Sequence, residues 1–164
     1  MSWKEEIERT LEHEGGYVND PHDPGGETQF GISKRRYPHL DIKNLTLDVA
    51  CHLYKKDYYD VLRCEQFTSG QVRWKVFDIG VNMGVRTAAK LLQMAVLVTA
   101  DGIIGPATIA ATNAMAPLDV VQQLADLQRR RYLAIITSNP KSEKFRNGWL
   151  KRAADLGQGL PEDV

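Results

Sequence analysis

The feature that most constrains the fold is a proline- and glycine-rich segment near the N-terminus. Residues 17–32 read YVNDPHDPGGETQFGI, with two prolines, three glycines, and Asp and Asn at turn positions. Proline and glycine both disfavour the interior of a helix, so we expect this segment to interrupt any helical pattern. Gly25–Gly26 suits a hairpin turn. The alternation of Thr28, Phe30 and Ile32 after it is typical of a strand. The segment therefore predicts a small, irregular β-hairpin.

Helical periodicity lies on both sides of this hairpin. Before it, Trp3, Ile7 and Leu11 fall on one helical face, and we expect the helix to begin at the N-cap Ser2 and to end at Gly15–Gly16. After it, apolar stripes at helical spacing continue almost to the end of the chain. These stripes predict helices at 47–61, 74–84, 87–98, from Pro106 onward, at 120–135 and at 145–156. The sequence therefore predicts an α+β fold that is predominantly helical.

Composition limits which partners and which cellular compartment we expect for the protein. The 164 residues carry no formal net charge, so we expect no nucleic-acid partner. No run approaches the 18 apolar residues of a membrane span, and no apolar leader is visible, so we expect no stable membrane insertion and synthesis in the cytoplasm. The two cysteines, Cys51 and Cys64, are too few for a disulfide framework, and we expect them reduced. The chain is expected to be a monomer.

Positive charge is nevertheless concentrated near the C-terminus. Between Gln128 and Arg152 the only acid is Glu143. The cations there are Arg129, Arg130, Arg131, Lys141, Lys144, Arg146, Lys151 and Arg152. Such a segment can bind an anionic polymer or surface, such as cell wall, nucleic acid or a membrane. A solvated helix face is the alternative.

Glu14 is the first candidate for chemistry. If the first helix continued to residue 14, a helical wheel would place Glu14 between Trp3 and Ile7, inside the apolar stripe. A carboxyl against apolar side chains holds its proton more readily, as a general acid must. The alternative is that Glu14 sits at a frayed helix end, where the stripe no longer has meaning.

The hairpin supplies candidates for a second group. Asp20, Asp23, Glu27 and Thr28 lie in or beside it. Glycosidases of the usual kind need an acid to protonate the leaving oxygen and a carboxylate opposite, which either activates water or attacks the sugar. A glutamate at a helix end and an acidic hairpin can form the two walls of such a cleft. Ordinary turn chemistry is the alternative for Asp20 and Asp23, which both precede proline.

The segment EGGYVNDPHDPGGETQFGISKRRYP, residues 14–38, resembles the signature of glycoside hydrolase family 108, the phage and bacterial N-acetylmuramidases. The similarity continues through NLTLDVACHLYKKDYYD, residues 44–60. It implies a lysozyme-like fold, hydrolysis of the β-1,4 bond between N-acetylmuramic acid and N-acetylglucosamine, and Glu14 as the catalytic glutamate.

The neighbouring phage-type lysozymes space a Glu, an Asp and a Thr by eight and then five residues. This chain has Glu14, eight residues, Asp23, four residues and Thr28, so the second spacing is one residue short. The resemblance implies that Asp23 and Thr28 hold the attacking water, and that the reaction inverts. Glu27 is the main competitor for the second carboxylate and a candidate substrate contact. Tyr17 and Phe30 are candidates for stacking on sugar rings, because they would flank the cleft.

The second half carries a further resemblance. FDIGVNMGVRTAAKLLQ, residues 77–93, and DGIIGPATIAA, residues 101–111, resemble the predicted peptidoglycan-binding module that often accompanies this hydrolase family. Asp78 and Asn82 lie one helical turn apart and could bind sugar hydroxyl or acetamido groups. Close helix packing and a turn into a helix are the favoured alternatives. We expect one lysozyme-like domain, in which residues 71–164 complete the fold begun by residues 1–70.

The predicted partner is the glycan strand of peptidoglycan, and no cofactor is expected. The four histidines lack the HxxxH or HExxH spacing of a zinc site, and the acidic loop lacks the ligand order of an EF-hand. Two functional alternatives remain: a lytic transglycosylase, and a non-catalytic wall-binding or secretion-activating protein. A wall hydrolase without a leader fits a phage lysin that passes a holin pore and acts on the wall after release. A chromosomal relative with another export route is the alternative.

Overall fold

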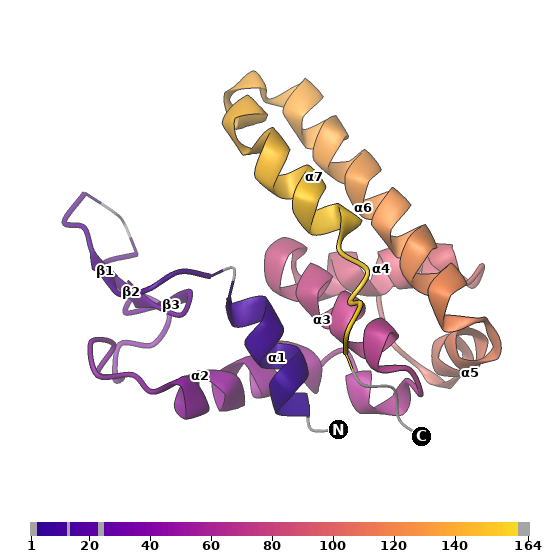
Figure 1. Cartoon of the computed structure of the whole chain (residues 1–164), viewed down its shortest axis with the longest axis horizontal. Coiled ribbons are helices and arrows are strands. Elements are labelled where there is room, and N and C mark those ends of the chain that lie inside the picture. The colour runs from indigo at the N-terminus through magenta and orange to yellow at the C-terminus, as the bar shows by residue number, and fades with distance from the viewer. Residues whose placement is uncertain (1–2, 13, 23–24, 161–164) are drawn as a thin grey trace. The chain divides into compact units, whose positions relative to one another are not determined.

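A computed structural model describes residues 3–12, 14–22 and 25–160 of the chain (Figure 1). The chain forms two compact units, Ser2–Asp57 and Tyr58–Val164. The expectation of one domain divided at residues 70 and 71 stays a prediction.

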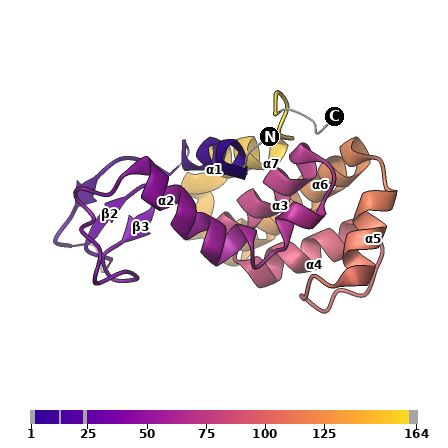
Figure 2. The same cartoon turned by 90° about the horizontal axis from the view of Figure 1, so that it is seen from below.

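The first unit combines two helices with a small antiparallel sheet. Its elements are α1 (Trp3–Leu11), β1 (Val18–Asn19), β2 (Glu27–Gln29), β3 (Ile32–Ser33) and α2 (Leu47–Tyr54). The strand order is β1-β2-β3, and both pairs are antiparallel. In Figure 2, β2 and β3 lie beside the start of α2. Thr46 caps α2, because its hydroxyl accepts a hydrogen bond from the Val49 amide.

The helix α1 packs against α2. Ile7 and Leu11 are buried in α1, and an ion pair of 2.5 Å between Lys4 and Asp48 joins the exposed sides of the two helices. The expected helix end at Gly15–Gly16 is wrong, since α1 ends at Leu11. The chain leaves it through a turn in which the Glu14 amide donates to the Leu11 carbonyl.

The expected hairpin is in fact three strands with a second turn. Gly26 directly precedes β2 and does not form a two-residue hairpin loop, whereas Phe30 and Gly31 form such a loop between β2 and β3. Both turn residues have positive φ, 51° and 73°, which is the geometry that matches the twist of paired strands. The residue types do not predict this turn, because phenylalanine seldom adopts the left-handed region.

The second unit is helical. A π-helical turn, η1 (Lys55–Tyr59), spans the boundary between the units. The other elements are η2 (Cys64–Gln66), α3 (Gly70–Met83), α4 (Val85–Ala95), α5 (Pro106–Ala114), α6 (Pro117–Ser138), η3 (Pro140–Phe145) and α7 (Arg146–Ala154). The predicted helix end at Gly84 and helix start at Pro106 are confirmed.

The core of this unit is built around α3. Residues 72–80 of α3 are all buried, and α4 and α6 pack against the helix. Figure 1 shows α6 and α7 side by side and antiparallel, joined at one end by η3. The predominantly helical α+β fold predicted from the sequence is confirmed. Within the described ranges, no helix has both the length and the apolar character to cross a membrane.

Candidate active site

Tyr54 connects the end of α2 to the turn between β2 and β3. Its side chain is buried, and its hydroxyl donates a 2.7 Å hydrogen bond to the carbonyl oxygen of Phe30. This bond holds the backbone of the turn against the helix. The turn is therefore supported by the two strands that it joins and by a side chain of α2.

Glu14 lies directly on this turn. A Cβ atom built at Gly31 would lie 3.0 Å from Glu14 Oε2, 3.2 Å from Glu14 Cβ and only 2.6 Å from Tyr54 Oη. The Glu14 carboxyl, the Tyr54 hydroxyl and the bare Gly31 backbone therefore form one cluster. The side chain of Glu14 is half-buried.

The position of Glu14 has a different cause from the one that the helical wheel suggested. Because α1 ends at Leu11, residue 14 is not part of the apolar stripe of the helix. The turn after α1 and the contact with Gly31 place the carboxyl instead. A half-buried carboxyl on a fixed turn can exchange a proton with a ligand atom that reaches it.

The strand register separates two of the candidate second groups. Thr28 pairs with Val18 and Ser33, whereas Glu27 pairs with Asn19. Successive side chains of a strand point to opposite faces of the sheet. Thr28 and Glu27 therefore lie on opposite faces, and only one of them can share a face with a bound ligand. Asp23 lies outside the described residues.

The face that carries Glu27 is occupied by protein groups. Gln29 lies on it and donates a 3.1 Å hydrogen bond to the Leu45 carbonyl. The Tyr17 hydroxyl lies close enough to Glu27 to form a hydrogen bond with it. Partial burial raises the pKa of this hydroxyl, and the charge and the hydrogen bond of Glu27 raise it further. Tyr17 is 39% exposed, and Phe30 is half-buried in its turn. Both aromatic candidates thus lie in the same small sheet region as Glu14.

Asp78 and Asn82 are engaged within the second unit. Asp78 is fully buried on α3, and its two carboxylate oxygens accept hydrogen bonds of 3.1 and 3.0 Å from Arg152. Asn82 accepts a short hydrogen bond from the hydroxyl of Tyr132. These contacts are those of helix packing, the alternative that the sequence favoured. A carboxylate with no exposed surface is not accessible to a sugar.

The DGIIGP segment is likewise a structural turn. Asp101 accepts hydrogen bonds from the Gln93 side chain and the Ile103 amide. The buried Gln93 also donates to the Ile103 carbonyl and the Thr108 hydroxyl, while its oxygen accepts from the Gly102 amide. One side chain of α4 thus fixes the path of the chain into α5. This supports the reading of the motif as a turn that leads into a helix.

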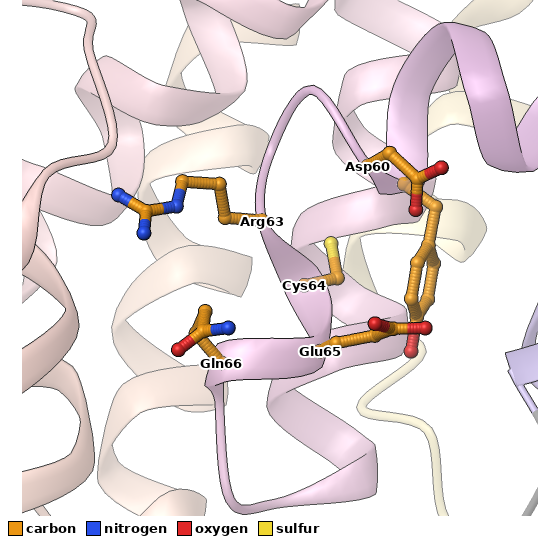
Figure 3. Close-up of a pocket in the computed structure, with 6 residues that line it drawn as sticks. Asp60, Arg63, Cys64, Glu65 and Gln66 are labelled. Carbon is orange, nitrogen blue, oxygen red and sulfur yellow. The ribbon is translucent and has the colours of Figure 1, made fainter.

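A polar pocket of about 150 Å³ opens in the second unit, and no sequence pattern indicated it. Its lining residues are Tyr59, Asp60, Arg63, Cys64, Glu65 and Gln66. Figure 3 shows Asp60 and Glu65 on one side of a short helical turn, and Arg63 and Gln66 on the other. The pocket offers carboxylate, guanidinium and amide groups to a polar ligand. In the part of the chain that the structure describes, no three His, Cys, Asp or Glu residues gather as a metal site.

Comparison with known proteins confirms both resemblances. Residues 7–84 match the family model of glycosyl hydrolase 108, and residues 84–154 match a model described as a predicted peptidoglycan domain. The solved structure of Brucella abortus SagA is similar, with a TM-score of 0.74 and 28% sequence identity over 93% of this chain and 89% of that chain. No curated protein matches the chain in sequence.

Proposed function

We propose that the protein is an N-acetylmuramidase whose general acid is Glu14. The proposal starts from the match of one part of the chain to glycosyl hydrolase 108 and of the other to a predicted peptidoglycan domain. The bond cleaved would be the β-1,4 bond between N-acetylmuramic acid and N-acetylglucosamine. The observation that carries the proposal is the placement of the Glu14 carboxyl on the fixed Phe30–Gly31 turn, within the segment that matches the hydrolase family.

In the proposed reaction the protonated Glu14 carboxyl donates its proton to the glycosidic oxygen as the bond to that oxygen breaks. Positive charge develops on the sugar, and a water molecule adds to the anomeric carbon and loses a proton to a base. We assign the positioning of this water to Asp23 and Thr28, with inversion at the anomeric carbon. Glu27 is the alternative base, on the opposite face of the sheet from Thr28.

The test is wall clearing in a gel that contains bacterial peptidoglycan. Glu14→Gln keeps the size of the side chain but removes the acid, and a general acid contributes a factor of about 10² to 10⁴ in rate. Glu12→Gln is the matched control, because Glu12 is an exposed carboxylate two residues away. We expect Glu12→Gln to clear the gel like the wild type and Glu14→Gln to fail. Equal clearing by Glu14→Gln, or no clearing by the wild type, would overturn the assignment.

Product analysis separates hydrolysis from the transglycosylase alternative. A hydrolase leaves reducing muramic acid ends, whereas a lytic transglycosylase leaves 1,6-anhydro ends, because no water attacks. We expect reducing ends. A wall-binding protein without turnover would produce neither kind of end from purified sacculi. The role in phage lysis stays a prediction.

A further inference from the structure

Three aromatic rings form a column that leads from the core of the second unit to its surface. The ring of Tyr132 on α6 stacks on that of Trp149 on α7, with 4.9 Å between centroids and 19° between planes. The ring of Phe145, at the end of η3, stacks on Trp149 at 5.2 Å and 22°. Tyr132 is buried, Trp149 is half-buried and Phe145 is 46% exposed. The outermost ring is therefore held in place from below.

Some of the cations around this column form ion pairs with acidic side chains, and others do not. Arg146 pairs with Glu143, and Arg152 pairs with Asp78. Lys141, Lys144 and Lys151 are exposed, and none of them has an ion pair among the residues that the structure describes. The Lys144 ammonium lies 5.1 Å from the centroid of the Phe145 ring. Positive charge is thus available beside an exposed aromatic ring.

A glycine leaves the helix backbone bare between these groups. Gly148 is the third residue of α7, three residues after Phe145 at the end of η3 and three before Lys151, which is therefore its neighbour on the surface of α7. It is exposed, and a Cβ atom built on it would meet nothing within 4 Å. Glycine weakens a helix interior relative to alanine, and packing gives no reason for it here. Close approach of a ligand to the backbone is a use that glycine permits.

We propose that Lys144, Phe145, Gly148, Trp149 and Lys151, the cation–aromatic face, bind the glycan strand of peptidoglycan. The apolar face of a pyranose ring would lie on the bare backbone at Gly148 and against the exposed part of Phe145, one face of whose ring Trp149 already covers. The two lysines would pair with free carboxylates of the peptides that the strand carries. A lysine that rests on an aromatic ring is already placed to meet a carboxylate at the edge of that ring.

This inference rests on the proposed function, because it takes peptidoglycan as the ligand, but it uses none of the residues assigned to cleavage. Charge complementarity favours this ligand, since within residues 140–154 the one acid, Glu143, is already bound by Arg146. A binding face of this kind would keep the enzyme on an insoluble substrate between successive cuts.

The first test is depletion binding to purified sacculi in the Glu14→Gln background, which prevents digestion during the measurement. Phe145→Ala is expected to weaken binding roughly tenfold, the loss expected for one aromatic contact of about 1.4 kcal/mol. Lys144→Gln with Lys151→Gln should weaken binding at low salt and reduce its salt dependence. Lys56→Gln, an exposed lysine elsewhere, is the control and should bind like the parent. Unchanged binding in Phe145→Ala or in the lysine pair overturns the proposal.

Gly148→Ala provides a second test, which does not depend on the truncation of Phe145. Alanine is the better helix former, and its methyl group enters open space, so the melting temperature should rise. If a sugar lies against the backbone there, the same variant should bind sacculi more weakly. A raised melting temperature with unchanged binding would overturn the proposal.

Further measurements identify the ligand and distinguish the proposed binding face from the proposed muramidase activity. Equal affinity of the parent for anionic vesicles or for DNA would overturn the glycan assignment. If the wild type clears the wall but the face variants bind normally, the cation–aromatic face is wrong and the muramidase proposal stands. If the wild type shows no cleavage, the proposed function fails, and sacculus binding by the Glu14→Gln protein still tests the face.

Discussion

Gly31 meets two independent requirements at a single residue. Its φ of 73° lies in the left-handed region, and its missing Cβ leaves room for the Glu14 carboxyl and the Tyr54 hydroxyl. The first requirement could be met by asparagine at some cost, but the second excludes every side chain. The position of the proposed acid therefore depends on the absence of a side chain opposite it.

Gly31→Ala is expected to damage activity more than stability. The left-handed backbone costs a non-glycine residue roughly 1–2 kcal/mol, and the methyl group would displace the Glu14 carboxyl. Misplacement by about 1 Å can lower a rate on the order of a hundredfold. The measurement is turnover of soluble wall fragments well below the melting temperature.

Gly84→Ala is the control for that measurement. It imposes backbone strain at a φ of 95°, but its Cβ meets open space. We expect it to lower the melting temperature and to leave the rate per folded molecule unchanged. A normal rate in Gly31→Ala would mean that the turn does not position the acid.

The two faces of the sheet give a second test at this scale. If Asp23 and Thr28 hold the attacking water, Asp23→Asn and Thr28→Ala should lower kcat strongly, while Glu27→Gln should mainly affect KM. The physical reason is that Thr28 and Glu27 lie on opposite faces of β2. Steady-state kinetics on a defined muropeptide oligomer measures both constants. The reverse pattern would assign the base to Glu27.

Sequence patterns identified residues unevenly. The order of residues in the EGGY segment singled out Glu14 as the candidate acid, because a match of many residues does not depend on where a helix ends. The helical wheel gave a wrong reason for the same residue, because it assumed a helix beyond Leu11. Asp78 looked suitable for sugars, and its partner Arg152 lies 74 residues away, which no local pattern reveals.

At the scale of elements, Lys75 joins two helices. It is fully buried on α3, and its ammonium donates hydrogen bonds of 2.9 and 2.7 Å to the carbonyls of Ala153 and Asp155, with a longer bond of 3.4 Å to that of Arg152. These carbonyls lie at the C-terminal end of α7, where backbone acceptors lack helical partners. A cation from one helix thus caps another.

This cap predicts a pH-dependent stability. Burial lowers the pKa of Lys75 to about 8, from an ordinary value of 10.5. Below pH 8 the lysine is protonated in both the folded and the unfolded chain. Between pH 8 and 10.5 only the unfolded chain binds this proton, so the contribution of Lys75 to stability rises with pH.

The comparison is with Lys75→Met, which has no titratable group at this position. We expect the wild-type advantage in the free energy of unfolding to grow by about 3 kcal/mol between pH 8 and 10.5. Urea unfolding of both proteins across this range gives the difference. A constant difference would mean that the lysine titrates in the folded protein as it does in the unfolded chain.

Helix ends and starts that are marked by glycine or proline were predictable. Gly84 ends α3 with a φ of 95°, and Pro106 begins α5, as their residue types indicate. The turn at Phe30–Gly31 was not predictable, because its first residue is neither glycine nor asparagine. The hydrogen bond from Tyr54, distant in sequence, is what supports that turn in the structure.

At the scale of the whole molecule, the family boundary and the packing boundary differ. The two family matches meet at residue 84, between α3 and α4. The compact units meet at residues 57 and 58. The hydrolase match therefore includes α3, whose packing partners α4 and α6 belong to the peptidoglycan match.

A fragment that ends at residue 84 is expected to lose the folded α3. Without α4 and α6 the apolar side chains of α3 lose their packing partners, and without α7 Asp78 has no Arg152. Limited proteolysis should cut the fragment within residues 70–83. Addition of a second fragment, residues 85–164, should restore protection. A protease-resistant α3 in the first fragment alone would contradict this coupling.

The fold class was predictable because helical periodicity and one proline- and glycine-rich interruption suffice to define it. The division into units was not, because it depends on which helices pack together, and periodicity shows only that each helix has an apolar face. The expectation that residues 71–164 complete a fold begun by residues 1–70 stays a prediction.

The Lys75 and Asp78 contacts also bear on how such proteins can be recombined. A hybrid that joins the first 84 residues of one relative to the later residues of another would bring together an α3 and an α7 that were selected in different chains. If the donor lacks a cation at the position of Arg152, the recipient's Asp78 stays buried without a counter-charge. Exchange of cell-wall specificity by gene fusion therefore calls for a junction before α3, or for transfer of both partners together.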